Sequence, residues 1–280
     1  MSSLNEPEKT GPESARPEHA RSENAGPEHA GSSGPTAGEA EPAARRVAAS
    51  RVVTSEPGEP APNLPGRSVV AIDGPAGSGK STVAKAVAER LRIDYLDTGA
   101  MYRAVAFTAM RRGVDPEDEV LVAKIAAEMS LDVAERVMVD GVDATIEIRS
   151  PEVTRAVSSV AINPLVRKEL VRRQREWAAD HGAGVVEGRD IGTVVFPEAP
   201  VKVYMTASDE QRAQRRSQEM LDMHYDEVAA DIARRDHVDS TRAHAPLAVA
   251  PDAIVVDTTS STVEQVVQLV LRLAAGAGLA

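Results

Sequence analysis

The 280-residue sequence contains no cysteine and only two Phe, one Trp and four Tyr residues. The absence of cysteine excludes disulfide frameworks, Cys-ligated zinc, iron–sulfur clusters and thiol catalysis. No segment approaches the roughly 18 uncharged apolar residues that a membrane helix needs, and the start of the chain lacks the basic and apolar regions of a secretion signal. We therefore expect a soluble, cytoplasmic protein that does not bind a membrane.

Basic residues are scarcer than acidic ones, since 32 Lys and Arg against 43 Asp and Glu give a formal net charge of −11. This balance argues against a stable nucleic-acid binder, whose affinity would come largely from neutralising phosphates. Six of the basic residues are lysines, so 32 − 6 = 26 are arginines. Two interpretations of this excess remain open: the composition of a GC-rich coding sequence, with Arg on solvated helix faces, or guanidinium clamps for phosphate.

Residues 1–65 have no aromatic side chain and few large aliphatic ones, and they repeat short runs such as Gly11-Pro-Glu-Ser-Ala15 and Gly26-Pro-Glu-His-Ala30. A segment of this composition buries too little apolar surface to offset the entropy lost on ordering. We predict a disordered tail over residues 1–66 and a folded domain over residues 67–280. A peptide-interaction arm is the alternative for the tail.

From Arg67 onward, short apolar runs alternate with longer segments of helical period, which is typical of an α/β sheet protein. The final helix is expected to begin with a capping box formed by Ser261 and Glu264. Because strands and helices alternate, we predict parallel pairing with right-handed crossovers. The apolar runs predict strands at residues 69–72, 184–186, 201–205 and 254–256.

One stretch departs from this alternation. Asp140-Gly141, a dipeptide typical of hairpin turns, lies between β-rich runs at residues 137–139 and 142–148. The run that follows, Ser150-Pro151-Glu152, offers an N-cap, a proline for the first helical position and a first-turn acid. We predict a small subdomain inserted at residues 131–155.

A glycine-rich motif follows the first predicted strand and precedes a predicted helix over residues 80–92: Gly74-Pro75-Ala76-Gly77-Ser78-Gly79-Lys80-Ser81 matches G-x-x-x-x-G-K-[ST]. Glycines let backbone N–H groups approach phosphate oxygens closely, and the helix N-terminus favours an anion. We expect Lys80 to contact the β and γ phosphates and the Ser81 hydroxyl to bind Mg²⁺, with Thr82 beside them. A glycine-rich turn without function is the alternative.

The motif alone predicts only nucleoside triphosphate binding, because motors, GTPases and small-molecule kinases share it. The acceptor is indicated by Asp97-Thr98-Gly99-Ala100-Met101-Tyr102-Arg103, by Glu187-Gly188-Arg189-Asp190, and by arginine-containing runs at residues 163–167, 172–175, 212–216 and 235–242. In these motifs, from Val69 to the last helix, the sequence resembles bacterial cytidylate kinases.

This resemblance implies a P-loop kinase fold, an α/β protein in which helices flank a central parallel sheet. The inserted hairpin and helix would bind the nucleoside monophosphate, and a helical lid at about residues 208–222 would close over ATP. The implied reaction moves the γ-phosphoryl group of ATP to CMP or dCMP with the help of Mg²⁺, within a monomer.

The resemblance also implies roles on the acceptor side. Arg103, Arg189 and Arg242 would hold the acceptor phosphate beside the Thr98 hydroxyl, because two anions approach each other only where fixed cations hold them. Asp190 and Arg167, helped by Ser158, would read cytosine, since a carboxylate accepts from the exocyclic amine and a guanidinium donates to N3 and O2. Arg235 and Asp239 would contact the ribose from the segment after a helix that begins near Asp226.

Arg212, Arg215 and Arg216 fall on one face of a helix whose start, Ser208 to Gln211, has capping-box spacing. In the resemblance this helix is the lid. Arg212 and Arg216 are then assigned to ATP, and Arg215 to catalysis together with Lys80, Arg189 and Asp190. A solvated basic stripe is the alternative. Two rival functions remain open: a kinase for UMP, AMP or another small acceptor, and an ATP-sensing binding module.

Overall fold

A computed structural model describes residues 66–219 and 224–279, so the predicted tail lies, except for Gly66, outside the described residues. The central sheet has five strands in the order β2-β6-β1-β7-β8, and all neighbouring pairs are parallel, as predicted. One of these strands, β2, is absent from the predicted set because it is short and half polar. The strands are β1 (Val69–Asp73), β2 (Asp94–Asp97), β6 (Gly184–Gly188), β7 (Val201–Thr206) and β8 (Ile254–Asp257).

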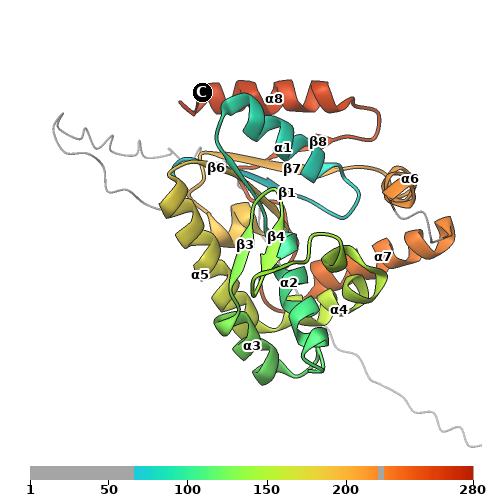
Figure 1. The fold of residues 1–280 in the computed structure, drawn as a ribbon. Coiled ribbons are helices and arrows are strands. Elements are labelled where there is room, and N and C mark those ends of the chain that lie inside the picture. The colour runs from blue at the N-terminus through green and yellow to red at the C-terminus, as the bar shows by residue number, and fades with distance from the viewer. Residues whose placement is uncertain (1–65, 220–223, 280) are drawn as a thin grey trace, which may run out of the picture. The chain divides into compact units, whose positions relative to one another are not determined.

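Helices cover both faces of this sheet (Figure 1). On one face α1 (Lys80–Leu91) and α8 (Val263–Gly276) pack against Val70 and Ile72 of β1. On the other, α2 (Thr98–Arg111), α3 (Glu119–Glu128), α4 (Pro151–Ile162) and α5 (Pro164–His181) share a core with Val69 and Ala71. Because both faces of β1 are buried, its first four residues form an unbroken apolar run, which ends at Asp73.

A second sheet of three antiparallel strands, β3 (Leu131–Val133), β4 (Val137–Val139) and β5 (Val142–Asp143), follows α3. Asp140 and Gly141 join β4 to β5 with φ values of 49° and 76°, the left-handed conformation that the Asp-Gly dipeptide predicts. β5 ends earlier than the predicted run over residues 142–148. The Asp143 side chain accepts from the Thr145 N–H and hydroxyl, which turns the chain into the short helix η1 (Glu147–Arg149).

The N-terminal capping residue of α4 is the predicted one, and that of α8 is displaced by one residue. The Ser150 hydroxyl accepts from the Val153 N–H at the start of α4, as predicted. At α8 the capping box is formed by Thr262 and Gln265, one residue later than the predicted Ser261 and Glu264. Glu264 is instead paired with Arg90 of α1 at 3.0 Å, so the side chain that would complete the predicted box is engaged elsewhere.

The remaining elements lie beyond the ends of β6 and β7. The π-helical turn η2 (Ile191–Val195) follows β6, whereas α6 (Asp209–Glu219) and α7 (Tyr225–Thr241) follow β7 and lie side by side (Figure 1). Within the described ranges, no helix has the length and apolar character needed to cross a membrane.

Candidate active site

The phosphate loop, residues 74–81, connects β1 to α1. Gly74 and Gly77 have φ values of 147° and 73°. A Cβ on Gly74 would lie 2.0 Å from the Met205 carbonyl oxygen, and one on Gly77 would lie 2.6 Å from the Arg212 carbonyl oxygen. Both positions therefore require glycine, for conformation and for space. Because α1 begins at Lys80 without a side-chain cap, its first N–H groups are available to an anion.

Lys80 carries the positive charge of this loop. Its ammonium group donates to the Pro75 carbonyl oxygen at 2.8 Å. Burial and, to a lesser extent, the nearby Arg189 lower the pKa of Lys80 to about 8, although the carboxylates of Glu187 and Asp73 act in the opposite direction. A pKa near this value keeps the ammonium group protonated in most molecules at neutral pH.

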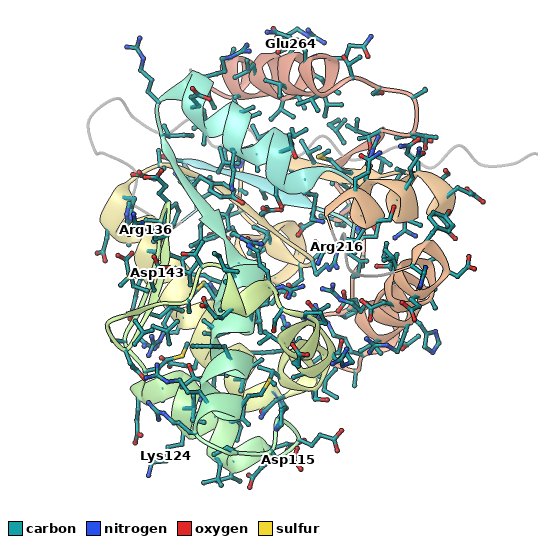
Figure 2. All side chains as sticks on the ribbon, turned by 45° about the vertical axis from the view of Figure 1, so that its right-hand side comes forward. Asp115, Lys124, Arg136, Asp143, Arg216 and Glu264 are labelled. Carbon is teal, nitrogen blue, oxygen red and sulfur yellow. The ribbon has the colours of Figure 1, made fainter. Side chains whose placement is uncertain are left out.

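A cavity of about 210 Å³ beside this loop gathers most of the predicted site residues. Arg216 extends into it from the side of α6 that faces the middle of the fold (Figure 2). The predicted residues that line the cavity are Ala76, Gly77, Gly79, Lys80, Ser81, Thr82, Thr98, Arg103, Ser158, Arg167, Arg189, Asp190, Arg216, Arg235, Asp239 and Arg242.

The arginines around this cavity repel one another, which disfavours the protonated form of each guanidinium group. Arg103 of α2 donates to the Ile148 carbonyl oxygen at 3.1 Å and to the Thr154 hydroxyl at 2.8 Å. Burial first, and then the charges of Arg235 and Arg216, lower the pKa of Arg103 to about 9. The pKa of Arg235 falls to about 10 because of burial and, among the neighbouring cations, mainly because of Arg189. An anion in the cavity would relieve this repulsion.

A buried network of acids and arginines occupies another part of the wall. Arg167 and Asp190, both 5% exposed, form an ion pair. Arg242 lies 3.6 Å from Asp190 and 3.7 Å from Asp239, and Arg189 pairs with Asp239 at 2.8 Å. Burial raises the pKa of Asp190, although Arg167 and Arg242 act in the opposite direction. The predicted base readers and phosphate ligands therefore contact one another directly.

The two residues predicted to contact the ribose lie on a different element from the one expected. Arg235 and Asp239 lie within α7, not on a segment after it, and Arg242 is the C-cap residue of that helix. The helix continues because residues 225–241 contain no Gly or Pro, and its first turn carries Asp226 and Glu227. Since Arg235 and Asp239 are four residues apart, both face the cavity from one side of α7.

The three arginines of α6 have separate surroundings. Arg212 is 6% exposed and is engaged by Asp209, Asp236 and the Ala76 carbonyl oxygen, so it supports the phosphate loop from outside the cavity. Arg215 donates to the Thr258 hydroxyl at 3.0 Å and to the Thr258 carbonyl oxygen at 2.6 Å. Arg216 alone among them lines the main cavity. The solvated stripe considered above does not describe Arg212, which is buried.

A second cavity, of about 330 Å³, adjoins the phosphate loop on the side of α8 and Arg215. It is lined by Gly77, Ser78, Gly79 and Thr82 together with Thr258, Ser261 and Thr262 of the β8–α8 connection. Sequence reasoning missed this connection. The available signal was its position, directly after the last strand of a parallel sheet, where such folds place ligand-binding loops.

Glu187 is a further residue absent from the predicted site, and it lines the main cavity at the end of β6. Its carboxylate is 3% exposed and accepts hydrogen bonds from the Tyr95 hydroxyl and from Ser81. Burial raises the pKa of Glu187, and the hydrogen bonds and Lys80 oppose that shift. The sequence does show a carboxylate directly after the apolar residues of β6, which could have suggested Glu187. Only the strand order, however, places β6 beside β1 and so brings Glu187 close to the phosphate loop.

Comparison with known proteins decides the family. A family model described as cytidylate kinase matches residues 70–275. The cytidylate kinase of Mycolicibacterium paratuberculosis is 51% identical over 208 residues, which cover 71% of this chain and 91% of that protein. The cytidylate kinases of Pelotomaculum thermopropionicum and Corynebacterium glutamicum are 49% and 47% identical, over 74% and 73% of this chain and 96% and 93% of their own lengths. The chain belongs to the cytidylate kinase family.

As a member of the cytidylate kinase family, the chain is a nucleoside monophosphate kinase with the P-loop kinase fold. The match begins one residue into β1 and ends in α8, so it includes every predicted site residue from Gly74 to Arg242. Residues 1–69 precede the matched range.

Proposed function

We propose that this cytidylate kinase transfers the γ-phosphoryl group of ATP to CMP or dCMP, giving ADP and CDP or dCDP. The observation that carries the proposal is one cavity lined by both a phosphate loop and a second set of arginines. A protein that only binds ATP has no use for this second set, whereas an enzyme that joins two phosphorylated nucleotides requires it.

On the donor side, the phosphate loop would hold the ATP phosphates, with Lys80 at the β and γ groups. The second cavity, between Arg215 and Thr262, offers space for the nucleoside of ATP. Arg216 lines the main cavity and would reach the transferring phosphoryl group from α6, whereas Arg215, to which the resemblance assigns catalysis, lines the second cavity and donates to Thr258. Arg212 would act indirectly, because its guanidinium is already engaged by Asp209 and Asp236.

On the acceptor side, Arg103, Arg189 and Arg242 would hold the CMP phosphate, with Thr98 beside them. The Thr98 hydroxyl donates its proton to the Glu187 carbonyl oxygen at 2.7 Å, so its lone pairs remain to accept from a donor such as one of these guanidinium groups.

Asp190 and Arg167 would read cytosine, with Ser158 of α4 on the same wall. Arg235 and Asp239 would contact the ribose. Uracil would leave the polar groups of this site unpaired, at a cost of roughly 1–3 kcal/mol per group.

A divalent cation fits the oxygen donors beside the phosphate loop. Ser81 and Glu187 are hydrogen-bonded to each other at the cavity wall, and a hydroxyl with a carboxylate is a donor set that suits Mg²⁺. We propose that Ser81, with Glu187, holds Mg²⁺ together with the ATP phosphates. The ion would supply charge neutralisation on the transferring group.

The acceptor attacks through a phosphate oxygen, so no strong general base and no covalent enzyme intermediate are required. The protein would position two anions in line and neutralise charge as it develops. The inserted subdomain at residues 131–155 and the lid, of which residues 208–219 are among the described residues and residues 220–222 are not, would close on the substrates and exclude water, which otherwise accepts the phosphoryl group. One copy of the chain carries every residue named, so we propose a monomer. We also propose a cytoplasmic location, in keeping with the expectation from the sequence.

Turnover with a panel of CMP, dCMP, UMP and AMP tests this function. We expect efficient phosphorylation of CMP and dCMP, slow phosphorylation of UMP and little of AMP, with all turnover lost when Mg²⁺ is chelated. A preference for UMP or AMP would favour another nucleotide kinase. Binding of ATP with no turnover of any acceptor would favour the sensing module.

We propose that residues 67–280 form the whole kinase domain. Removing residues 1–65 is expected to leave the melting temperature and the turnover of CMP almost unchanged, because this composition offers no apolar face for docking. Calorimetry and steady-state kinetics on the truncated chain test this, and limited proteolysis should give a stable fragment that begins near Arg67. A truncated chain that unfolds several degrees earlier would contradict the boundary.

A further inference from the structure

Asp73, the last residue of β1, links the donor half of the site to the acceptor half. It directly precedes the phosphate loop and is 4% exposed. One carboxylate oxygen accepts from the Ile191 N–H at 2.8 Å, and the other accepts from the Gly192 N–H at 2.7 Å. These are the first two residues of η2, immediately after Arg189 and Asp190. Both oxygens of a buried acid are therefore used to hold the segment that follows the acceptor residues.

A reciprocal contact strengthens this link. The Arg189 guanidinium donates to the carbonyl oxygen of Gly74, the residue after Asp73. Asp73 also lies opposite Gly188 in the parallel pairing of β1 with β6. Gly192 leaves room for this approach: a Cβ there would lie 3.4 Å from the Asp73 carboxylate, an ordinary contact, and 3.1 Å from the Lys202 Cδ, which would have to shift slightly. The start of the phosphate loop and the Arg189–Asp190 segment are thus joined from both sides.

From this geometry we propose that Asp73 is a positioning residue that sets the acceptor nucleotide in register with the donor phosphates. The inference rests on the proposed function, in which Arg189 and Asp190 hold CMP. In-line transfer requires the reacting atoms to be about 3–3.5 Å apart, and a misplacement of about 1 Å can cost roughly 100-fold in rate. Asp73 needs no contact with either substrate for this role.

The ionised carboxylate suits the role because it accepts two N–H groups at once. The pKa of Asp73 is raised to about 6, chiefly by burial and in part by Asp190, although the Gly192 and Ile191 N–H groups and Lys80 act in the opposite direction. The group is therefore ionised at pH 7.5. An asparagine of the same shape would turn an NH₂ donor toward one of the two N–H donors and lose that bond.

The test is Asp73→Asn, with Asp118→Asn as the matched control. Asp118 also accepts from two backbone N–H groups, those of Val120 and Leu121, but at the start of α3. Two rates are measured at pH 7.5 with saturating ATP: transfer to CMP at saturating CMP, and ATP hydrolysis without CMP. The ratio of transfer to hydrolysis does not depend on the fraction of folded protein, and a purely structural role would leave it unchanged.

We expect Asp73→Asn to lower this ratio about tenfold or more, because transfer depends on register and hydrolysis depends only on the donor loop. Asp118→Asn should leave the ratio at its wild-type value. The expected tenfold loss corresponds to roughly 1.4 kcal/mol. A ratio for Asp73→Asn within about twofold of the ratio for Asp118→Asn would overturn the proposal. A wild-type protein that fails to phosphorylate CMP would instead reject the proposed function.

Discussion

Lys80→Ala is expected to lower kcat for CMP phosphorylation about 100-fold or more, because removing a cation from charge that develops in the transition state commonly costs this much. Lys80 donates to the Pro75 carbonyl oxygen and lines the cavity beside Arg189. The lowered pKa, about 8, indicates that the ammonium group is held at a cost in burial and in repulsion by Arg189. Bound phosphates would remove that cost.

The fold should tolerate Lys80→Ala, since the substitution relieves a buried charge and alanine favours the first turn of α1. Lys124→Ala is the matched control: its side chain is 65% exposed on α3, at the end of the fold opposite Glu264 (Figure 2). Rates are measured with both substrates saturating, and melting temperatures check folding. A Lys80→Ala variant that keeps more than about a tenth of wild-type kcat contradicts the assigned role.

Asp190→Asn is expected to lower kcat/KM for CMP about 100-fold, because breaking a buried, hydrogen-bonded charge pair costs about 2–5 kcal/mol. The substitution removes the partner of Arg167 and weakens the attraction to Arg242. It also changes what the site offers the base, since an amide presents a donor where a carboxylate presents only acceptors. The preference for CMP over UMP should therefore narrow by about tenfold, the equivalent of one hydrogen bond.

Asp239→Asn is the control variant for Asp190→Asn. It removes a negative charge from the same network at a residue that is not proposed to contact the base. Asp239 also contacts Arg189 and Arg242, but its proposed partner is the ribose, which CMP and UMP share. This variant should weaken both acceptors and leave their ratio unchanged. If Asp190→Asn also leaves the CMP to UMP ratio unchanged, Asp190 does not read the base.

Local features of the fold were predictable from neighbouring residues. The Asp140-Gly141 turn and the Ser150 cap depend on contacts within a few residues, so composition and spacing specify them. One local prediction, the capping box at the start of α8, failed because a distant residue intervened. Glu264 would complete a capping box with Ser261, yet it pairs with Arg90, which is 174 residues away in the chain.

For the candidate site too, the sequence indicates which residues to consider, whereas the contacts between them depend on the fold. The proposed site residues follow from the phosphate-loop motif and from the resemblance to cytidylate kinases, and the cavity brings most of them together. How they are paired was not readable. Arg167 and Asp190 stand 23 residues apart, and Arg212 and Asp236 stand 24 apart, so no short motif contains either pair.

The sequence by itself determined the family, the glycine positions of the phosphate loop and the set of arginines, because these depend on residue type and short-range spacing. Only the tertiary structure decided that β6 lies between β2 and β1, which places Glu187 beside Ser81 and brings Asp73 to the Ile191 N–H, 118 residues along the chain. Strand order and side-chain contact over such separations depend on how helices and strands pack into one core, and that packing has no periodic trace in the sequence.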